Sequence, residues 1–172
     1  MIRLLGMLCI LAGGAGTGIS LAKELEMRIR ELTEIQKLML LLKGEIRYIH
    51  RPLPEVFRHL SDRASAPFRD FFFCTAEELQ ERRGRTAEEI WEKNLRQYLN
   101  GLHISRQERM DFEKLGSMLG QLDVEMQMNT LDYYLEQLKQ SVSEASKQAK
   151  GQGRIYRYLG VLGGAALVIL IF

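Results

Sequence analysis

Few residues in this sequence interrupt a helix, and few can cross-link the chain. Only three prolines occur in 172 residues, and two of them flank Leu53. Scarce proline with abundant Leu, Glu, Gln and Lys favours helices. Of the two cysteines, Cys9 lies in an apolar run near the start of the chain and Cys74 stands alone in the middle. The central part of the chain therefore cannot form a disulfide framework, which favours a reducing compartment. No stretch alternates apolar and polar residues as a half-buried strand does. These features predict an all-α fold.

The chain also lacks the motifs of common active sites. It has no GxxxxGK[ST] phosphate loop, and its serines do not stand in a nucleophile elbow. Its three histidines have no second ligand at metal spacing, and Cys74 has no partner for zinc. A net charge of +2 gives no reason to expect nucleic-acid binding. We therefore predict that the protein is not an enzyme, has no cofactor, and binds neither nucleic acid nor a small-molecule substrate.

What the sequence does contain is an apolar run at each end. The last stretch, residues 159–172, reads LGVLGGAALVILIF and carries no charged side chain. Counted from Ile155, it offers about 18 residues, or roughly 27 Å of helix. A membrane core is ~30 Å thick, so residues 155–172 are predicted to be a transmembrane segment. A buried core helix is the alternative interpretation of this run.

Residues 4–22 form a second uncharged run, between Arg3 and Lys23. We predict a transmembrane segment over residues 1–22, because an amphipathic helix continues out of the run without a break. The alternative is a cleaved signal peptide, in which Ser20-Leu21-Ala22 is the small-x-small cleavage site and the protein is exported.

Basic residues near the two predicted spans belong to the central part of the chain, whereas only Arg3 lies outside it. By the positive-inside rule, the domain of residues 23–154 faces the cytoplasm. The basic residues that carry this inference are Lys23, Arg28, Arg30, Lys147, Lys150 and Arg154, together with Arg157 in the first turn of the second predicted span.

Two long amphipathic helices are predicted next to the spans. Apolar residues at three- and four-residue spacing form a stripe over residues 25–49, and this helix is expected to stop near His50, because the residue before Pro52 disfavours the α conformation. Residues 128–149 carry an a/d seam typical of a coiled coil. The stripes are about 36 and 32 Å long, and we expect the two helices to pair as one stalk.

Shorter helices are predicted between the two long ones. Pro54 suits the first turn of a helix. Capping boxes at Thr86–Glu89 and Ser105–Glu108 begin two more, and Asp123 is a plausible N-cap for the last long helix. The prediction is therefore a bundle of about six helices, two of them continuous with terminal spans.

Several short motifs, in their order and spacing, resemble stage III sporulation protein AB of endospore-forming bacteria over nearly the whole chain. The matching residues are Glu45-Ile46-x-Tyr48-x-His50-x-Pro52-Leu53, Trp91-Glu92, Leu115-Gly116-x-x-Leu119-Gly120-x-x-Asp123 with Gln127, and Leu159-Gly160-x-Leu162-x-Gly164. Arg51 departs from the family pattern, in which a small hydroxyl residue is expected.

The resemblance implies a sporulation protein of the mother cell, in the outer forespore membrane, with its soluble domain in the mother-cell cytoplasm. The family is also similar to the cytoplasmic helical domain of the inner-membrane platform proteins of type II secretion and type IV pilus systems. It therefore implies a platform in the channel or secretion complex that links mother cell and forespore. The implied partners are the stage III sporulation ATPase, protein AA, and other channel proteins.

The family-like residues converge at the end of the predicted stalk farthest from the membrane. We expect the partner to dock there, through residues that include Glu45, Tyr48, His50, Arg51, Asp123 and Gln127. The alternative for these residues is fold maintenance alone. For the whole protein, the alternative is a membrane-anchored sensor or enzyme whose function lies in the helical domain.

Overall fold

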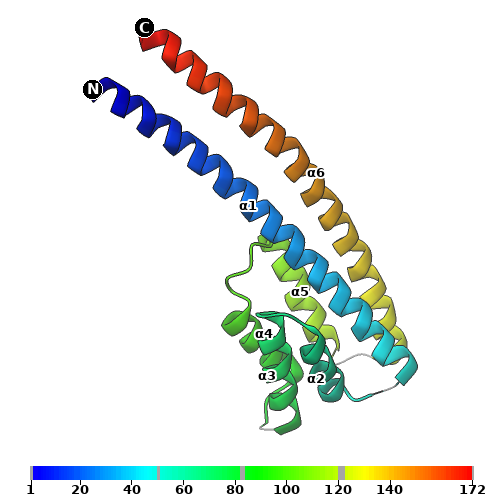
Figure 1. Cartoon of the computed structure of the whole chain (residues 1–172). Coiled ribbons are helices and arrows are strands. Elements are labelled where there is room, and N and C mark those ends of the chain that lie inside the picture. The colour runs from blue at the N-terminus through cyan, green and yellow to red at the C-terminus, as the bar shows by residue number, and fades with distance from the viewer. Residues whose placement is uncertain (1, 50, 82–83, 120–122, 172) are drawn as a thin grey trace. The chain divides into compact units, whose positions relative to one another are not determined.

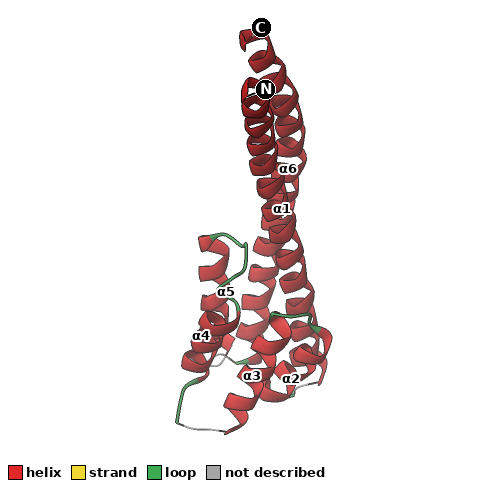
Figure 2. Ribbon diagram, turned by 60° about the vertical axis from the view of Figure 1, so that its left-hand side comes forward, coloured by secondary structure: helices red, strands yellow, loops and turns green. Residues whose placement is uncertain are grey.

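The computed structural model describes residues 2–49, 51–81, 84–119 and 123–171, and within them it contains helices and no strand (Figure 2). The elements are α1 (Ile2–Gly44), the π-helical turn η1 (Glu45–Ile49), α2 (Leu53–Arg63), α3 (Phe68–Glu81), α4 (Ala87–Tyr98), α5 (Arg106–Leu119) and α6 (Val124–Ile171). The all-α prediction is confirmed for this part of the chain.

The chain divides into two compact units, which we describe separately. The central unit is Arg30–Val142, and the terminal unit joins Met1–Ile29 to Ser143–Phe172. In the terminal unit, Arg28 Nη1 donates to Gln148 Oε1 over 3.4 Å, so α1 and α6 lie side by side there. In the central unit, Lys43 of α1 pairs with Asp132 of α6, and α2 to α5 pack alongside these two helices (Figure 1).

No helix is long and apolar enough to cross a membrane in the part of the chain that was searched, which is limited to the described residues. The two predicted spans, residues 1–22 and 155–172, fall at the ends of α1 and α6, where side chains lie outside the described residues. Both spans, and the domain boundaries at residues 23 and 154, stay predictions.

The core of the central unit is built around Trp91 of α4. Its indole is 1% exposed and lies 4.8 to 6.1 Å, centroid to centroid, from four phenylalanine rings. Offset and edge-to-face pairs of this kind each stabilise a core by about 0.5–1.5 kcal/mol beyond the area they bury. The indole N–H donates to the carbonyl oxygen of Phe112 over 3.3 Å, so its polar atom is satisfied. The four rings belong to Phe57, Phe71, Phe72 and Phe112.

The predicted helix starts are confirmed. At α4, the Thr86 hydroxyl accepts from the Glu89 N–H over 3.2 Å, and the Glu89 carboxylate accepts from the Thr86 N–H over 3.0 Å. Ser105 and Glu108 make the same reciprocal pair at α5, with distances of 3.2 and 2.6 Å. α2 begins at Leu53, with Pro54 in its first turn. Each box satisfies backbone N–H groups that the first turn leaves without a helical partner.

The seam predicted on α6 is only partly buried. Leu131, Leu138 and Ala145 are 3% exposed or less, while the other predicted seam residues are half-buried. Tyr134, which the 3/4 pattern omits, is 5% exposed and stacks on Phe112 with ring centroids 6.3 Å apart. The buried face of α6 in the central unit is therefore centred between the predicted seam and Tyr134.

Two side chains tie loops of the central unit to its helices. Glu31 of α1 is 8% exposed and accepts from the backbone N–H of His103 over 2.6 Å, while its other oxygen lies 2.9 Å from the His103 Nδ1. Arg109 donates to the carbonyl oxygens of Leu99, Asn100 and Leu102 at 2.7, 3.1 and 3.4 Å. Together they hold the α4–α5 connection against α1 and α5.

Candidate docking site

The predicted docking residues fall in three places along the chain. Glu45 and Tyr48 lie on η1, Arg51 lies in the connection to α2, and Asp123 and Gln127 lie at the start of α6. His50 lies outside the described residues. We call η1, the 51–54 connection and the first turn of α6 the tip of the central unit; in Figure 1 they are the end of the cyan α1 and the start of the yellow α6.

The Lys43–Asp132 pair sets the register between α1 and α6 at the tip. Tyr48 comes five residues after Lys43, and Gln127 comes five residues before Asp132. Because the helices run antiparallel, these equal steps of roughly 7 Å place η1 level with the first turns of α6. The structure therefore brings together at one end two segments that the sequence separates by about 75 residues.

Asp123 and Gln127 hold the corner between α5 and α6. Asp123 Oδ1 accepts from the Met126 N–H over 2.8 Å, which confirms the predicted N-cap. Gln127 is 9% exposed, and its Nε2 donates to the Leu119 carbonyl oxygen over 2.6 Å. That carbonyl lies in the last turn of α5, where no helical N–H remains to bind it. These two residues thus have structural roles, and Gln127 presents little surface to a partner.

Glu45, Arg51 and His59 form a charged cluster beside α2. Arg51 Nη1 lies 2.5 Å from Nδ1 and 2.8 Å from Nε2 of His59. It also lies 3.6 Å from Glu45 Oε2, and Glu45 Oε1 lies 3.6 Å from His59 Nδ1. Glu45 Oε2 is buried and accepts no hydrogen bond from the described residues. No pattern in the sequence pointed to His59, which comes eight residues after Arg51 on the next helix.

Next to this cluster is a cavity of about 460 Å³ between α2 and α3. Arg51 and His59 line it together with Glu55, Arg58 and Glu77. Arg58 pairs with Glu77, and its guanidinium lies 4.3 Å from the centroid of the Phe73 ring. Acidic and basic side chains both line the cavity, so it has no single-sign field for a small anion or cation.

Among the large apolar side chains of the tip with a described exposure, Tyr48 is the most exposed. Its ring is 77% exposed, and the Arg47 guanidinium lies 5.7 Å from the ring centroid. Val124 and Met126, at the start of α6, are 46% and 53% exposed. Tyrosine, arginine and methionine are enriched where proteins bind one another. The exposed groups of the tip can therefore bury apolar area against a protein partner.

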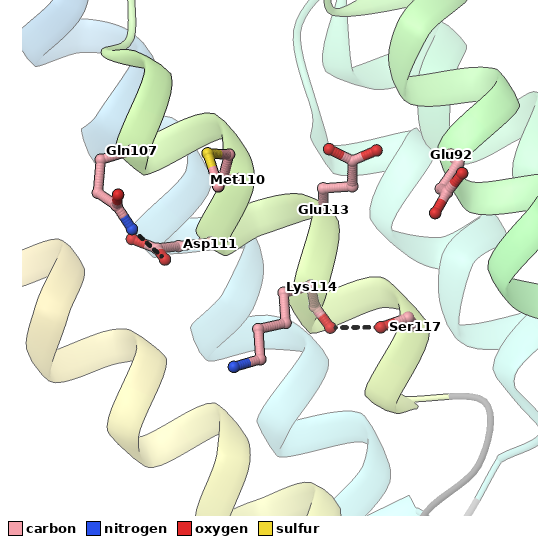
Figure 3. A pocket seen from close by; sticks show the side chains of 7 residues that line it. All are labelled: Glu92, Gln107, Met110, Asp111, Glu113, Lys114 and Ser117. Atoms are coloured by element: carbon pink, nitrogen blue, oxygen red, sulfur yellow. Dashed lines mark hydrogen bonds between the residues drawn. The ribbon is translucent and has the colours of Figure 1, made fainter.

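A shallow groove on α4 and α5 offers no reaction centre (Figure 3). It measures about 360 Å³ and is lined by Glu92, Gln107, Met110, Asp111, Glu113, Lys114 and Ser117. Its polar groups bind within the fold: Gln107 donates to Asp111 over 2.9 Å, and the Ser117 hydroxyl donates to the Lys114 carbonyl over 2.9 Å (Figure 3). Within the described residues, no three His, Cys, Asp or Glu side chains are grouped closely enough to hold a metal ion.

Shifted pKa values occur at packed positions away from the tip. Burial raises the pKa of the Tyr134 hydroxyl well above its usual range, and the carboxylates of Asp111 and Glu108 add to this. The hydrogen bond with Cys74 raises the pKa of Tyr98, and burial adds to it. These shifts follow from packing and local hydrogen bonds, and both tyrosines stay neutral at physiological pH.

The sequence model of a protein family, described as stage III sporulation protein AB, matches residues 3–172. The chain belongs to the stage III sporulation protein AB family. The match covers the motifs quoted above, including those at η1 and at the start of α6. Membership of this family makes the chain a stage III sporulation protein.

A solved structure, "Stage III sporulation protein AB", has the same fold. It superposes with a TM-score of 0.65 at 22% identity, and the match covers 72% of this chain and 96% of that one. At this identity the likeness shows the fold alone. A comparison with curated proteins gave no match.

Proposed function

We propose that this chain is a non-enzymatic platform in the complex that links mother cell and forespore, and that it docks the cytoplasmic stage III sporulation ATPase, protein AA, through its tip. The predicted spans at residues 1–22 and 155–172 anchor it in the outer forespore membrane. The domain of residues 23–154 then lies in the mother-cell cytoplasm. Family membership supports the sporulation role, and the exposed groups of the tip support docking.

The exposure of Tyr48 carries the docking proposal. An aromatic ring that is 77% exposed at the end of a helix gains burial only from a partner. Aromatic residues of this kind often dominate binding, because they bury much area while losing little conformational entropy. Asp123 and Gln127 support the site indirectly, by holding the start of α6 level with η1.

We expect Tyr48→Ala to weaken binding of the ATPase by roughly tenfold or more, since a residue at the centre of an interface contributes about 2 kcal/mol. Binding is measured with the full chain in lipid nanodiscs and purified ATPase. Tyr133→Ala is the matched control, because Tyr133 is a tyrosine of α6 that is 69% exposed but lies outside the tip.

Both variants remove an exposed ring, so we expect their unfolding curves to match wild type. Equal affinity for wild type and Tyr48→Ala would place the docking site elsewhere. Equal weakening by both tyrosine variants would show that binding depends on exposed aromatic surface in general and not on the tip.

We expect a reporter fused at Ser65 to behave as cytoplasmic and a reporter fused after Phe172 to behave as translocated. The reason is the excess of Lys and Arg in residues 23–154 next to both predicted spans. The measurement is the activity of paired reporters that function on opposite sides of the membrane. A mature protein that begins at Lys23 would replace the first span with a cleaved signal peptide.

A further inference from the structure

Two lysines of the terminal unit have no carboxylate beside them. Lys147 and Lys150 of α6 are exposed, and among the described residues their side chains have no ion-pair or hydrogen-bond partner. Several lysines of the central unit do pair with Asp or Glu, namely Lys37, Lys43, Lys93 and Lys139. The charge of Lys147 and Lys150 is therefore available to a ligand from outside the chain.

The two lysines begin a row of cations along α6. This helix runs without a break from Val124 to Ile171, so spacing in the sequence gives position on the helix. The row is Lys147, Lys150, Arg154 and Arg157, at steps of three, four and three residues. Residues at this spacing share one side of a helix. The side chains of the two arginines lie outside the described residues, and their place in the row comes from the sequence alone.

Acidic side chains do not balance this row from within α6. Glu144 is the last acidic residue of the sequence. It comes three residues before Lys147, at a spacing that allows an ion pair, yet the two do not pair. The row is therefore a segment of α6 with four positive charges and no negative one.

α1 does not supply the missing negative charge. Arg28 Nη1 donates to Gln148 Oε1, which sets this part of α1 beside the start of the row. Residues 23–30 contain three cations, Lys23, Arg28 and Arg30, and two carboxylates, Glu24 and Glu26. Three positive and two negative charges leave this segment at +1, so it adds to the charge of the row.

We propose that this row, through Lys147 and Lys150 first, binds the phosphate groups of anionic phospholipids. The inference rests on the predicted span at residues 155–172, which is part of the proposed function. Lys150 comes five residues before that span, or roughly 7 Å along the helix, so its long side chain reaches the headgroup region. Clusters of four to eight Lys or Arg immediately cytoplasmic of a transmembrane helix attract anionic lipids in this way.

A lipid fits this row better than a nucleic acid does, because the row leads straight into an apolar run. Its last member, Arg157, stands within the predicted span, where a nucleic acid has no access. Tyr156 and Tyr158 belong to the same turn of sequence, and tyrosine is enriched where a membrane meets water. Phosphate, apolar chains and the interface between them are met together only in a phospholipid.

The test counts lipids bound to the full chain by native mass spectrometry from detergent micelles. The probes are phosphatidylglycerol and phosphatidylcholine with the same acyl chains. In wild type we expect phosphatidylglycerol to bind about tenfold more tightly or better, because each Lys or Arg near a membrane surface contributes about fivefold. In the double variant Lys147→Gln/Lys150→Gln we expect most of this preference to be lost.

The matched control is the double variant Lys114→Gln/Lys139→Gln, which removes the same charge from exposed lysines of the central unit. It is expected to keep the wild-type preference, and circular dichroism checks that both double variants are as helical as wild type. Equal affinity of wild type for the two lipids, or an unchanged preference in Lys147→Gln/Lys150→Gln, would overturn the proposal. Equal loss in both double variants would also overturn it, since net charge alone would then explain the preference.

A final arm separates a lipid site from a site for free phosphate. Inorganic phosphate at the concentration of the lipid is expected to leave phosphatidylglycerol bound; displacement by it would contradict the lipid assignment. The reporter fusions judge the predicted spans, and Tyr48→Ala judges docking. A wild-type chain that inserts in the membrane but does not distinguish the two lipids therefore contradicts this inference and leaves the proposed function in place.

Discussion

Replacing Gly116 with alanine is expected to lower the free energy of unfolding by about 3 kcal/mol or more, the upper end of the range for overpacking a core. A Cβ atom at this position meets three atoms of the Trp91 indole at 2.2 Å. The indole cannot move aside, because it is 1% exposed and its polar atom is held by the Phe112 carbonyl. Either α5 shifts away from α4 or the ring leaves its packing; both lose contacts in the centre of the core.

Unfolding of Gly116→Ala is followed by the fluorescence of Trp91, which is the single tryptophan of the chain. Gly44→Ala is the matched control. It is also a helical glycine, near the end of α1, but a Cβ there meets nothing within 4 Å. Alanine at position 44 is expected to raise stability by ~0.5–1 kcal/mol through helix propensity. Near-equal stability of the two variants would mean that α5 does not approach Trp91 this closely.

Replacing Leu131 with aspartate is expected to cost about 4 kcal/mol or more and to unfold the central unit or bring it close to unfolding. Leu131 is 0% exposed, so the substitution loses roughly 1.5–3 kcal/mol of apolar burial. It also places a carboxylate at a position with no solvent exposure, which adds several kcal/mol. Whole domains are stable by only about 5–15 kcal/mol.

Neighbouring positions on α6 make the Leu131 prediction specific. Leu135→Asp also changes a residue of the predicted seam, but Leu135 is half-buried, so its cost is expected to be smaller. Tyr133→Asp changes a side chain that is 69% exposed and is expected to alter stability by about 0.5 kcal/mol or less. Far-UV circular dichroism and Trp91 fluorescence measure the series. Equal effects at all three positions would mean that α6 does not bury this face.

The structure divides the predicted docking residues by role. Asp123 and Gln127 bind backbone groups at the α5–α6 corner. These contacts maintain the fold, which was the alternative to docking for the two residues. Tyr48 has an exposed ring that no packing requirement explains. Arg51 lies between these cases, since its side chain is half-buried and its Nη1 lies 3.6 Å from Glu45 Oε2.

Local chemistry in the sequence was enough to predict where most helices begin. The capping boxes at Thr86 and Ser105, the N-cap at Asp123 and the first-turn Pro54 act within three or four residues, so a linear pattern contains all of their partners. The apolar stripe of α1 was also predicted from the sequence, and the structure buries its central residues. Those that are 1% exposed or less are Leu32, Ile35, Met39 and Leu42. The family motifs were recognisable for the same reason.

By itself, then, the sequence determined the all-α class, the helix starts, the inward face of α1 and the family, because each depends on periodicity or on neighbours along the chain. Only the tertiary structure decided that Tyr134 is buried and that Glu31 binds His103 across 72 residues. It alone also placed His59 against Arg51 and Glu45. These contacts join side chains from different helices, and their geometry depends on how the helices pack, which no spacing within one helix encodes.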